Sequence, residues 1–226
     1  SQTKISPMVN IGGLFPDELN RHFTSIAKSI TKDIPDSHEY NMIRPVTTQT
    51  FSQLTRFTPE ICFKYLKNIS DNKATGHDGI SVKVLKKTWP YICDIVTDMF
   101  NRALIEGVFP SQWKTARVIP IHKGGDIKDP SNYRPISILP VLSKIFEKHV
   151  NYQIQKYLTT NKLLHKLQCG FREGYSCVDS LHKLISDCLS ARSDGHFVAM
   201  MFLDFKKAFD CVNHKILLKK LTMYGI

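Results

Sequence analysis

The sequence predicts an α+β fold in which helices dominate and strands are few. Apolar residues recur three and four positions apart through several long segments, which is the spacing of amphipathic helices. Two short segments are predicted to be strands: residues 115–122, which contain three large apolar side chains, and the apolar run at 197–203. With 226 residues, 42% hydrophobic and 23% charged, the chain can bury the core of one large domain or two small ones.

The first third of the chain is predicted to hold two helices joined by a linker. After an irregular lead-in over residues 1–14, residues 15–30 carry apolar side chains at helical spacing, with a proline suited to the first turn. Residues 32–56 are rich in proline, serine and threonine and are expected to form a loop or linker with a short extended piece. A Thr-Pro pair then predicts a helix over 58–69, and a glycine-containing loop is expected at 70–80.

Three further helices are expected in the middle of the chain. For the first, Thr88 is the expected cap, Pro90 lies in the expected first turn, and Gly107 ends the helix. Helical spacing of apolar residues predicts the other two at 143–158 and 178–191.

Each predicted strand is followed by a turn or a polar residue. The strand at 115–122 precedes a glycine pair that permits a tight turn. The run at 197–203 is predicted to be a strand buried on both faces, and Asp204 comes directly after it. A basic amphipathic helix is expected over 213–225.

Charge and cysteine content narrow the class of protein. The net charge of +11 favours a polyanionic partner, with a merely solvated basic surface as the alternative. No apolar stretch is long enough for a membrane span and no secretion signal is seen, so nucleic acid is favoured over a membrane. Six cysteines without a C-x-x-C pair predict a reduced, intracellular protein of the nucleus or cytoplasm that is not secreted. The nine histidines show no metal-binding spacing.

Four sequence blocks occur in an order that is known from one family. They are NKATGHDGIS at 72–81, ARVIPIHKGGDIKDPSNYRPISILP at 116–140, QCGFREGYSCVDSL at 168–181 and FVAMMFLDFKKAFDCVNHKILLKKL at 197–221. Together they resemble the fingers and the first palm motif of reverse transcriptases, most closely those of non-LTR (LINE-type) retrotransposons. Group II intron maturases and telomerase share that fold and are related alternatives.

The resemblance implies an RNA-directed DNA polymerase, a nucleotidyltransferase that uses two Mg²⁺ ions. Asp204 falls at the position that binds both metals, and the backbone carbonyl of Phe205 is expected to add a ligand beside the nucleotide. Phe209 falls at the position whose ring excludes a ribose 2′ hydroxyl. Position alone favours a helix cap or turn for Asp204 and a core role for Phe209. Asp210 is expected to form a turn ahead of the last helix.

The same resemblance implies a nucleotide-binding hairpin and a template-binding segment. Lys123 and Arg134 fall where the family clasps the incoming triphosphate, although two solvated hairpin cations are the plain alternative. Gln168, Phe171 and Arg172 fall in the segment that lies against the template, with an ordinary turn as an equal alternative. Lys73 lies in a glycine loop that the family places near template or primer.

The implied division is a helical extension at 1–70, fingers at 71–192 and the start of a palm at 193–226. A complete active site needs two more aspartates, and no Asp-Asp pair occurs in the sequence. We therefore expect a truncated α+β fragment that is inactive alone. Its expected partners are RNA template, DNA primer, dNTP and the downstream palm and thumb of the same polyprotein. The alternatives are a non-catalytic RNA/DNA-binding remnant lacking the Asp-Asp motif and a protein-interaction module with a basic surface.

Overall fold

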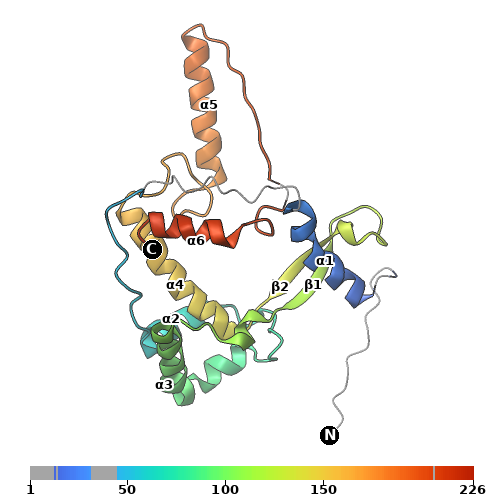
Figure 1. The fold of residues 1–226 in the computed structure, drawn as a ribbon, viewed down its shortest axis with the longest axis vertical. Coiled ribbons are helices and arrows are strands. Elements are labelled where there is room, and N and C mark those ends of the chain that lie inside the picture. The colour runs from blue at the N-terminus through green and yellow to red at the C-terminus, as the bar shows by residue number, and fades with distance from the viewer. Residues whose placement is uncertain (1–12, 14, 32–44, 206) are drawn as a thin grey trace. The chain divides into compact units, whose positions relative to one another are not determined.

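The computed structural model of the chain describes residues 13, 15–31, 45–205 and 207–226 (Figure 1). The chain divides into two compact units: residues 1–39 with 52–155, and residues 40–51 with 156–226. The predicted lead-in at 1–14 and the linker as far as residue 44 lie almost entirely outside the described residues.

The described residues confirm a helix-rich α+β fold. Their α-helices are α1 (Pro16–Thr31), α2 (Pro59–Lys67), α3 (Val82–Glu106), α4 (Val141–Thr160), α5 (Cys177–Ser193) and α6 (His214–Met223). Strands β1 (Arg117–His122) and β2 (Tyr133–Ile138) form a two-stranded antiparallel sheet, and short 3-10 helices lie at η2 (Ser111–Lys114) and η3 (Pro130–Asn132). Helices were therefore predicted in the right places, with boundaries that differ at α3.

The first unit has one aromatic-rich core between α2, α3 and the first part of α4. Phe100 of α3 is fully buried, and its ring centroid lies 4.7 Å from Phe57, 5.7 Å from Phe146 and 5.4 Å from Trp113. Aromatic pairs at these separations contribute beyond the area that they bury. The apolar stripes predicted from helical spacing therefore meet in this core.

Helix α3 begins earlier than the sequence predicted. The side chain of Ser81, and not Thr88, accepts from the backbone of Val84 and caps the helix, while Pro90 lies inside it. Thr88 instead donates its hydroxyl to the carbonyl of Val84 within the helix. The helix tolerates Pro90 because buried residues on both sides hold it in the core, so packing overrides the local breaker signal.

The end of α3 was predicted correctly. Gly107 has φ 64° and its backbone N–H donates to the carbonyl of Ala103. A left-handed residue at this position favours glycine, which pays no Cβ penalty there.

The segment before α2 is held to α3 and α4 by side-chain amides. Asn101 accepts from the backbone N–H of Phe57 at 2.8 Å and donates to its carbonyl at 3.1 Å. Gln153 accepts from the N–H of Thr55 at 2.6 Å, and His149 Nε2 lies 2.9 Å from the Thr55 carbonyl. These side chains take the place of a neighbouring strand and fix the chain as it enters the core.

The hairpin of β1 and β2 carries α1 on one face. Its register pairs His122 with Tyr133 and Ile121 with Arg134. Tyr133 is buried against Leu19 of α1, with Phe23 beside them. Side chains alternate between the two faces along a strand. Ile121 and Arg134, which pair with each other, are therefore expected on the face opposite Tyr133.

The second unit is built around the end of α6. The N–H of Val46 donates to the carbonyl of Met223, and the Tyr157 hydroxyl lies 2.9 Å from the carbonyls of Gln49 and Tyr224. Gly225 has φ 77°, and a Cβ atom there would collide with the carbonyl oxygen of Gln49. The glycine that the sequence placed after this helix is therefore required by close backbone contact.

The predicted buried strand at 197–203 is absent, which corrects that prediction. The segment has no strand hydrogen bonds, and its large side chains are exposed, with Phe197 and Met201 at 105% and 83%. A strand needs a neighbour for its backbone N–H and C=O groups. Within the described residues, β1 and β2 pair with each other and no strand lies along this segment.

The helices of the second unit also expose apolar residues. Neither α5 nor α6 has a buried residue, although Leu181 and Leu189 of α5 are apolar. Their termini are nevertheless well defined. Ser176 and Asp179 form a capping box at α5, and Asn213 caps α6, as expected for its start.

Candidate active site

Lys123 and Arg134 project from the same face of the β1–β2 hairpin. The backbone N–H of Lys123 donates to the carbonyl of Asn132 at 2.9 Å, which extends the ladder by one step beyond the pair of Ile121 and Arg134. Lys123 follows Ile121 by two residues, so its side chain falls on the face shared by Ile121 and Arg134. Both cations are exposed, and strand alternation favours the same face of the hairpin for their side chains.

The loop between the strands is held in shape by polar side chains. Asn132 donates from its amide to the carbonyl of Asp126 at 3.0 Å, and a Cβ atom on Gly125 would lie 2.7 Å from that amide. Asp129 accepts from the N–H and the hydroxyl of Ser131, which holds the pKa of its carboxyl below the usual value. The fixed loop limits the positions that Lys123 can take.

Asn132 was missed as a candidate residue by the sequence reasoning. Its signal is an asparagine just before a strand, a residue type that often forms turns by bonding nearby backbone. That signal does not predict the hydrogen bond from the Lys123 N–H to the Asn132 carbonyl, because this bond depends on how the loop closes.

Asp204 and Phe205 lie in the exposed segment that follows α5. The side chains of Asp204 and Phe205 are exposed, with Phe205 at 80%. Nowhere in the described part of the chain do three or more His, Cys, Asp or Glu residues gather as metal ligands. Magnesium is held through carboxylates in near-octahedral geometry, and a two-metal site shares several of them. One carboxylate and one carbonyl do not fit a two-metal site by themselves.

Phe209 lies against Phe171 of the predicted template segment. Their ring centroids are 5.7 Å apart and their planes meet at 84°, an edge-to-face pair. Phe171 has φ 58°, which is unusual for a bulky residue. The structure thus joins two predicted site residues that are separated by 38 positions in the sequence.

The other two residues of the template segment make local contacts. Arg172 stacks over the ring of Tyr175 at 4.3 Å and donates to the carbonyl of His165. Gln168 donates from its side chain to the carbonyl of Gly170 at 3.2 Å. These contacts shape the turn, which the sequence analysis weighed equally with template binding.

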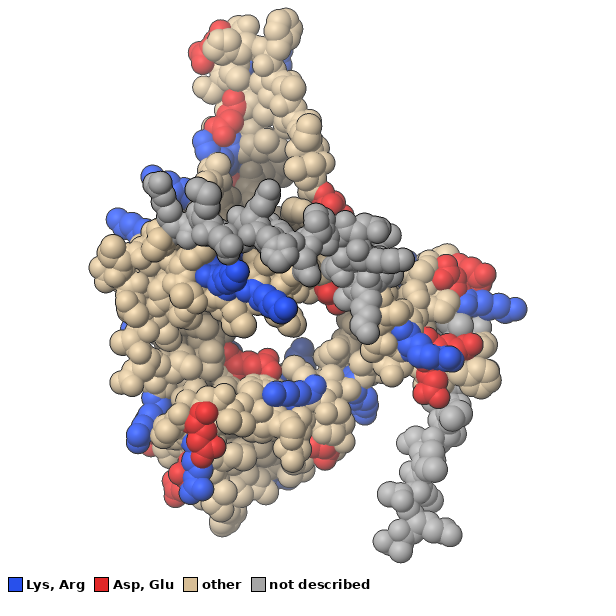
Figure 2. All heavy atoms as spheres, viewed as in Figure 1, with Lys and Arg blue, Asp and Glu red and all other residues tan. Residues whose placement is uncertain are grey.

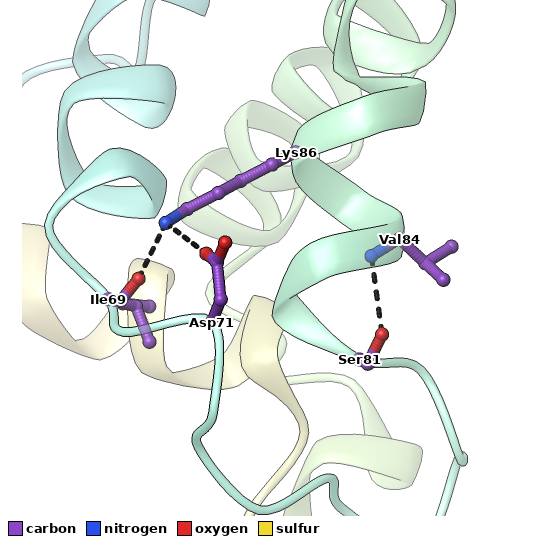
Figure 3. Close-up of polar contacts among 5 residues, drawn as sticks. All are labelled: Ile69, Asp71, Ser81, Val84 and Lys86. Atoms are coloured by element: carbon purple, nitrogen blue, oxygen red, sulfur yellow. Dashed lines mark hydrogen bonds and ion pairs between the residues drawn. The ribbon is translucent and has the colours of Figure 1, made fainter.

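Lys73 lies exposed in the loop between α2 and α3, and this loop packs closely elsewhere. A Cβ atom on Gly76 would lie 2.7 Å from the nitrogen and 2.9 Å from the Cα of Pro140. The close approach inferred from glycine at this position is therefore to the backbone just before α4. Lys86 of α3 holds the same loop through Asp71 at 2.6 Å and the carbonyl of Ile69 at 2.7 Å (Figure 3).

The candidate residues fall into two groups, each described within its own unit. Lys73, Lys123 and Arg134 belong to the first unit. The second unit contains the group formed by Gln168, Phe171, Arg172, Asp204, Phe205 and Phe209. The structure brings Phe171 and Phe209 into contact, and Lys123 and Arg134 lie on neighbouring ends of one hairpin.

Comparison with known proteins defines the class. Residues 121–226 match the family described as reverse transcriptase (RNA-dependent DNA polymerase). That segment includes the hairpin cations, the aromatic pair and Asp204.

The chain is also similar to curated proteins of transposons and other mobile elements. The chain is 35% identical over 162 residues to the probable RNA-directed DNA polymerase from transposon X-element of Drosophila melanogaster, covering 71% of this chain and 18% of that protein. It is 33% identical over 156 residues to the protein of transposon BS, covering 69% and 17%. It is 28% identical over 213 residues to the RNA-directed DNA polymerase from mobile element jockey, covering 92% of this chain and 22% of that protein. The transposon BS and jockey proteins also come from Drosophila melanogaster.

Residues 121–226 therefore belong to a reverse transcriptase domain, and the chain resembles the RNA-directed DNA polymerases of mobile elements. It spans about a fifth of the length of the relatives that it matches. Among the residues that the structure describes, no helix is both long and apolar enough to cross a membrane.

Proposed function

We propose that this chain forms the fingers and the start of the palm of an RNA-directed DNA polymerase that copies a retroelement RNA. The observation that carries the proposal is the hairpin, whose register and strand alternation support a shared face for Lys123 and Arg134. A point charge and a bidentate guanidinium can together neutralise and orient a triphosphate. The match of residues 121–226 to the reverse transcriptase family supports a nucleotide as the ligand of this face.

The proposed sugar-binding residue is Phe209. A bulky ring beneath the incoming sugar clashes with a ribose 2′ hydroxyl, so deoxynucleotides are preferred by exclusion. Its edge-to-face contact with Phe171 supports a defined ring position. Phe205 belongs to the same proposed nucleotide site.

Asp204 is the proposed metal ligand, together with the Phe205 carbonyl. Two Mg²⁺ ions, when bound, would activate the primer 3′ hydroxyl and neutralise the leaving diphosphate. Because one carboxylate does not hold two ions, the proposal requires further carboxylates from downstream palm of the same polyprotein. In that site Asp204 would supply a hard carboxylate oxygen.

The proposed nucleic-acid contacts are those of Lys73, Gln168, Phe171 and Arg172 with RNA template and DNA primer. An exposed aromatic ring can stack on a base, and an arginine can contact phosphate. The division into an extension at 1–70, fingers at 71–192 and palm from 193 is part of the same proposal. Such a polymerase would act inside the cell, in the nucleus or the cytoplasm.

A chimera tests the catalytic proposal. The jockey polymerase aligns with 92% of this chain, so its matching stretch can be replaced by this sequence. We expect the chimera to extend a labelled DNA primer on an RNA template with Mg²⁺. Asp204→Asn should lower the rate at least about 10³-fold, because metal charge stabilisation is worth several kcal/mol.

Asp210→Asn is the matched control, since this acid lies six residues on, in a turn. It should keep most of the activity, and Phe209→Val should raise incorporation of ribonucleotides. Full activity of the Asp204→Asn chimera would refute the metal role. A chimera that binds RNA but never extends a primer would favour the non-catalytic RNA/DNA-binding alternative.

A further inference from the structure

We propose that Lys162 and Lys166, in the turn after α4, form a second nucleic-acid phosphate site. It lies outside the residues assigned above to template, nucleotide or metal. The site goes beyond the proposed polymerase function and does not depend on the role of Asp204. Its ligand is the phosphate backbone of single-stranded RNA.

Lys162 occupies a backbone position that normally belongs to glycine. Its φ is 54°, its N–H donates to the carbonyl of Thr159, and the next N–H, of Leu163, donates to that of Leu158. This pair of hydrogen bonds is the Schellman ending of a helix, with Lys162 at the left-handed residue. A non-glycine residue there costs energy because its Cβ crowds the backbone. A cationic side chain is favoured at the carbonyl end of a helix, and the Lys162 side chain is exposed there.

Lys162 is one of several cationic or titratable residues that line an open pocket. The pocket has a volume of about 610 Å³, and Lys162, His165, Lys166 and Tyr224 contribute its polar lining. Three leucines, at 163, 164 and 167, supply the apolar wall. Such a mixture suits a nucleotide, whose phosphate takes the charge while the base or sugar covers the apolar wall.

The residues that line the pocket include no aspartate or glutamate. Residues 156–172 and 211–226 together carry seven lysines and arginines and no aspartate or glutamate. The two segments meet where the Tyr157 hydroxyl lies 2.9 Å from the Tyr224 carbonyl. Lys220 precedes Tyr224 by one helical turn, and its carbonyl accepts from the Tyr224 N–H. Figure 2 shows Lys or Arg side chains gathered over α6.

Basic side chains that lie close together attract a polyanion by counterion release. Exposed lysines pair with acids elsewhere in the described residues, as Lys183 does with Asp187. Lys162 and Lys166 take part in none of the ion pairs between described residues. Their charges are therefore available to phosphate.

Lys162→Gly separates a binding role from a structural one. Glycine relieves the left-handed strain, so the melting temperature should be at least as high as that of the wild-type chain. Affinity for a fluorescent 20-nucleotide poly(U) RNA, measured by anisotropy in 0.1 M salt, should fall about fivefold. The slope of log affinity against log salt should flatten by about 0.7, the value for one lost single-strand contact.

Lys207→Gly is the matched control. Lys207 also has a left-handed backbone, with φ 50°, and lies in the same unit. Its replacement by glycine removes the same charge as Lys162→Gly. It should leave RNA affinity within about twofold of wild type, less than the fivefold change of one phosphate contact. Lys166→Gln does not touch the left-handed residue and should weaken RNA binding as Lys162→Gly does.

Each remaining result would overturn the proposal. Unchanged affinity in Lys162→Gly and Lys166→Gln would remove the site. Equal losses in Lys162→Gly and Lys207→Gly would assign the effect to net charge. Absence of RNA binding by the wild-type chain would also refute it, and equal competition by polyglutamate would assign the surface to an acidic protein partner.

Discussion

Replacing Asn101 by leucine tests whether side-chain amides hold the segment before α2 in the core. The Asn101 amide makes two hydrogen bonds to the backbone of Phe57, at 2.8 and 3.1 Å. Phe57 itself is 3% exposed and packs on Phe100 and Phe146. Leucine would leave both backbone groups of Phe57 without these partners, at a site that is partly buried.

The expected loss follows from these two groups. A buried polar group left without a partner costs about 1–3 kcal/mol, and partial exposure of this site places the pair at about 2–4 kcal/mol. A loss of about 3 kcal/mol lowers the melting temperature by roughly 6–12 °C in a chain of this size. Urea unfolding followed by tryptophan fluorescence measures it, because Trp89 and Trp113 are both buried in the same unit.

Arg102→Leu is the control, because it places the same side chain one residue further along α3. Its ion pair with Asp98 is exposed, so its loss should cost less than about 0.5 kcal/mol. A destabilisation by Asn101→Leu below about 1 kcal/mol, or one equal to that of Arg102→Leu, would refute this account of the anchor.

Three further changes have expected outcomes. Burial lowers the pKa of His149, so this histidine binds a proton more readily in the unfolded chain than in the folded one. The free energy of unfolding should therefore fall as pH drops below about 6.5, and it should fall less in His149→Gln. Burial raises the pKa of the Cys62 thiol to about 11, so native chain at pH 8 should react with a thiol reagent at the exposed Cys177 and not at Cys62, and rapid labelling of Cys62 would contradict its burial. Gly225→Ala should release the end of α6, since its Cβ would meet the Gln49 carbonyl and lie 2.6 Å from the Tyr157 hydroxyl; unchanged hydrogen exchange in α6 would argue against this packing.

Local signals predicted those elements whose ends and faces are set by nearby residues. Gly107 ended α3 and Asn213 began α6 as expected, because a left-handed residue or a capping side chain acts within one turn. The start of α3 was misplaced because Ser81 and Thr88 both have side chains able to cap. Only packing across the helix decides which of two such signals is used.

The candidate site also has a part that the sequence predicted and a part that only the tertiary structure shows. The resemblance of the sequence motifs to reverse transcriptases indicated Lys123, Arg134, Asp204 and Phe209 as candidate site residues. Such a resemblance can be recognised from residue types and their order alone. The contact between Phe209 and Phe171 could not be predicted, since it joins two loops far apart along the chain. The role assigned to Asn132 likewise depends on the closure of a loop.

The sequence by itself determined the helix-rich α+β class, the basic character and the resemblance to reverse transcriptases. Helical spacing, charge and motif order are all properties of the chain as written. Tertiary structure alone decided whether an apolar run becomes a strand. The run at 197–203 has the composition of one but remains exposed and unpaired, because a strand forms only where neighbouring backbone accepts and donates its hydrogen bonds.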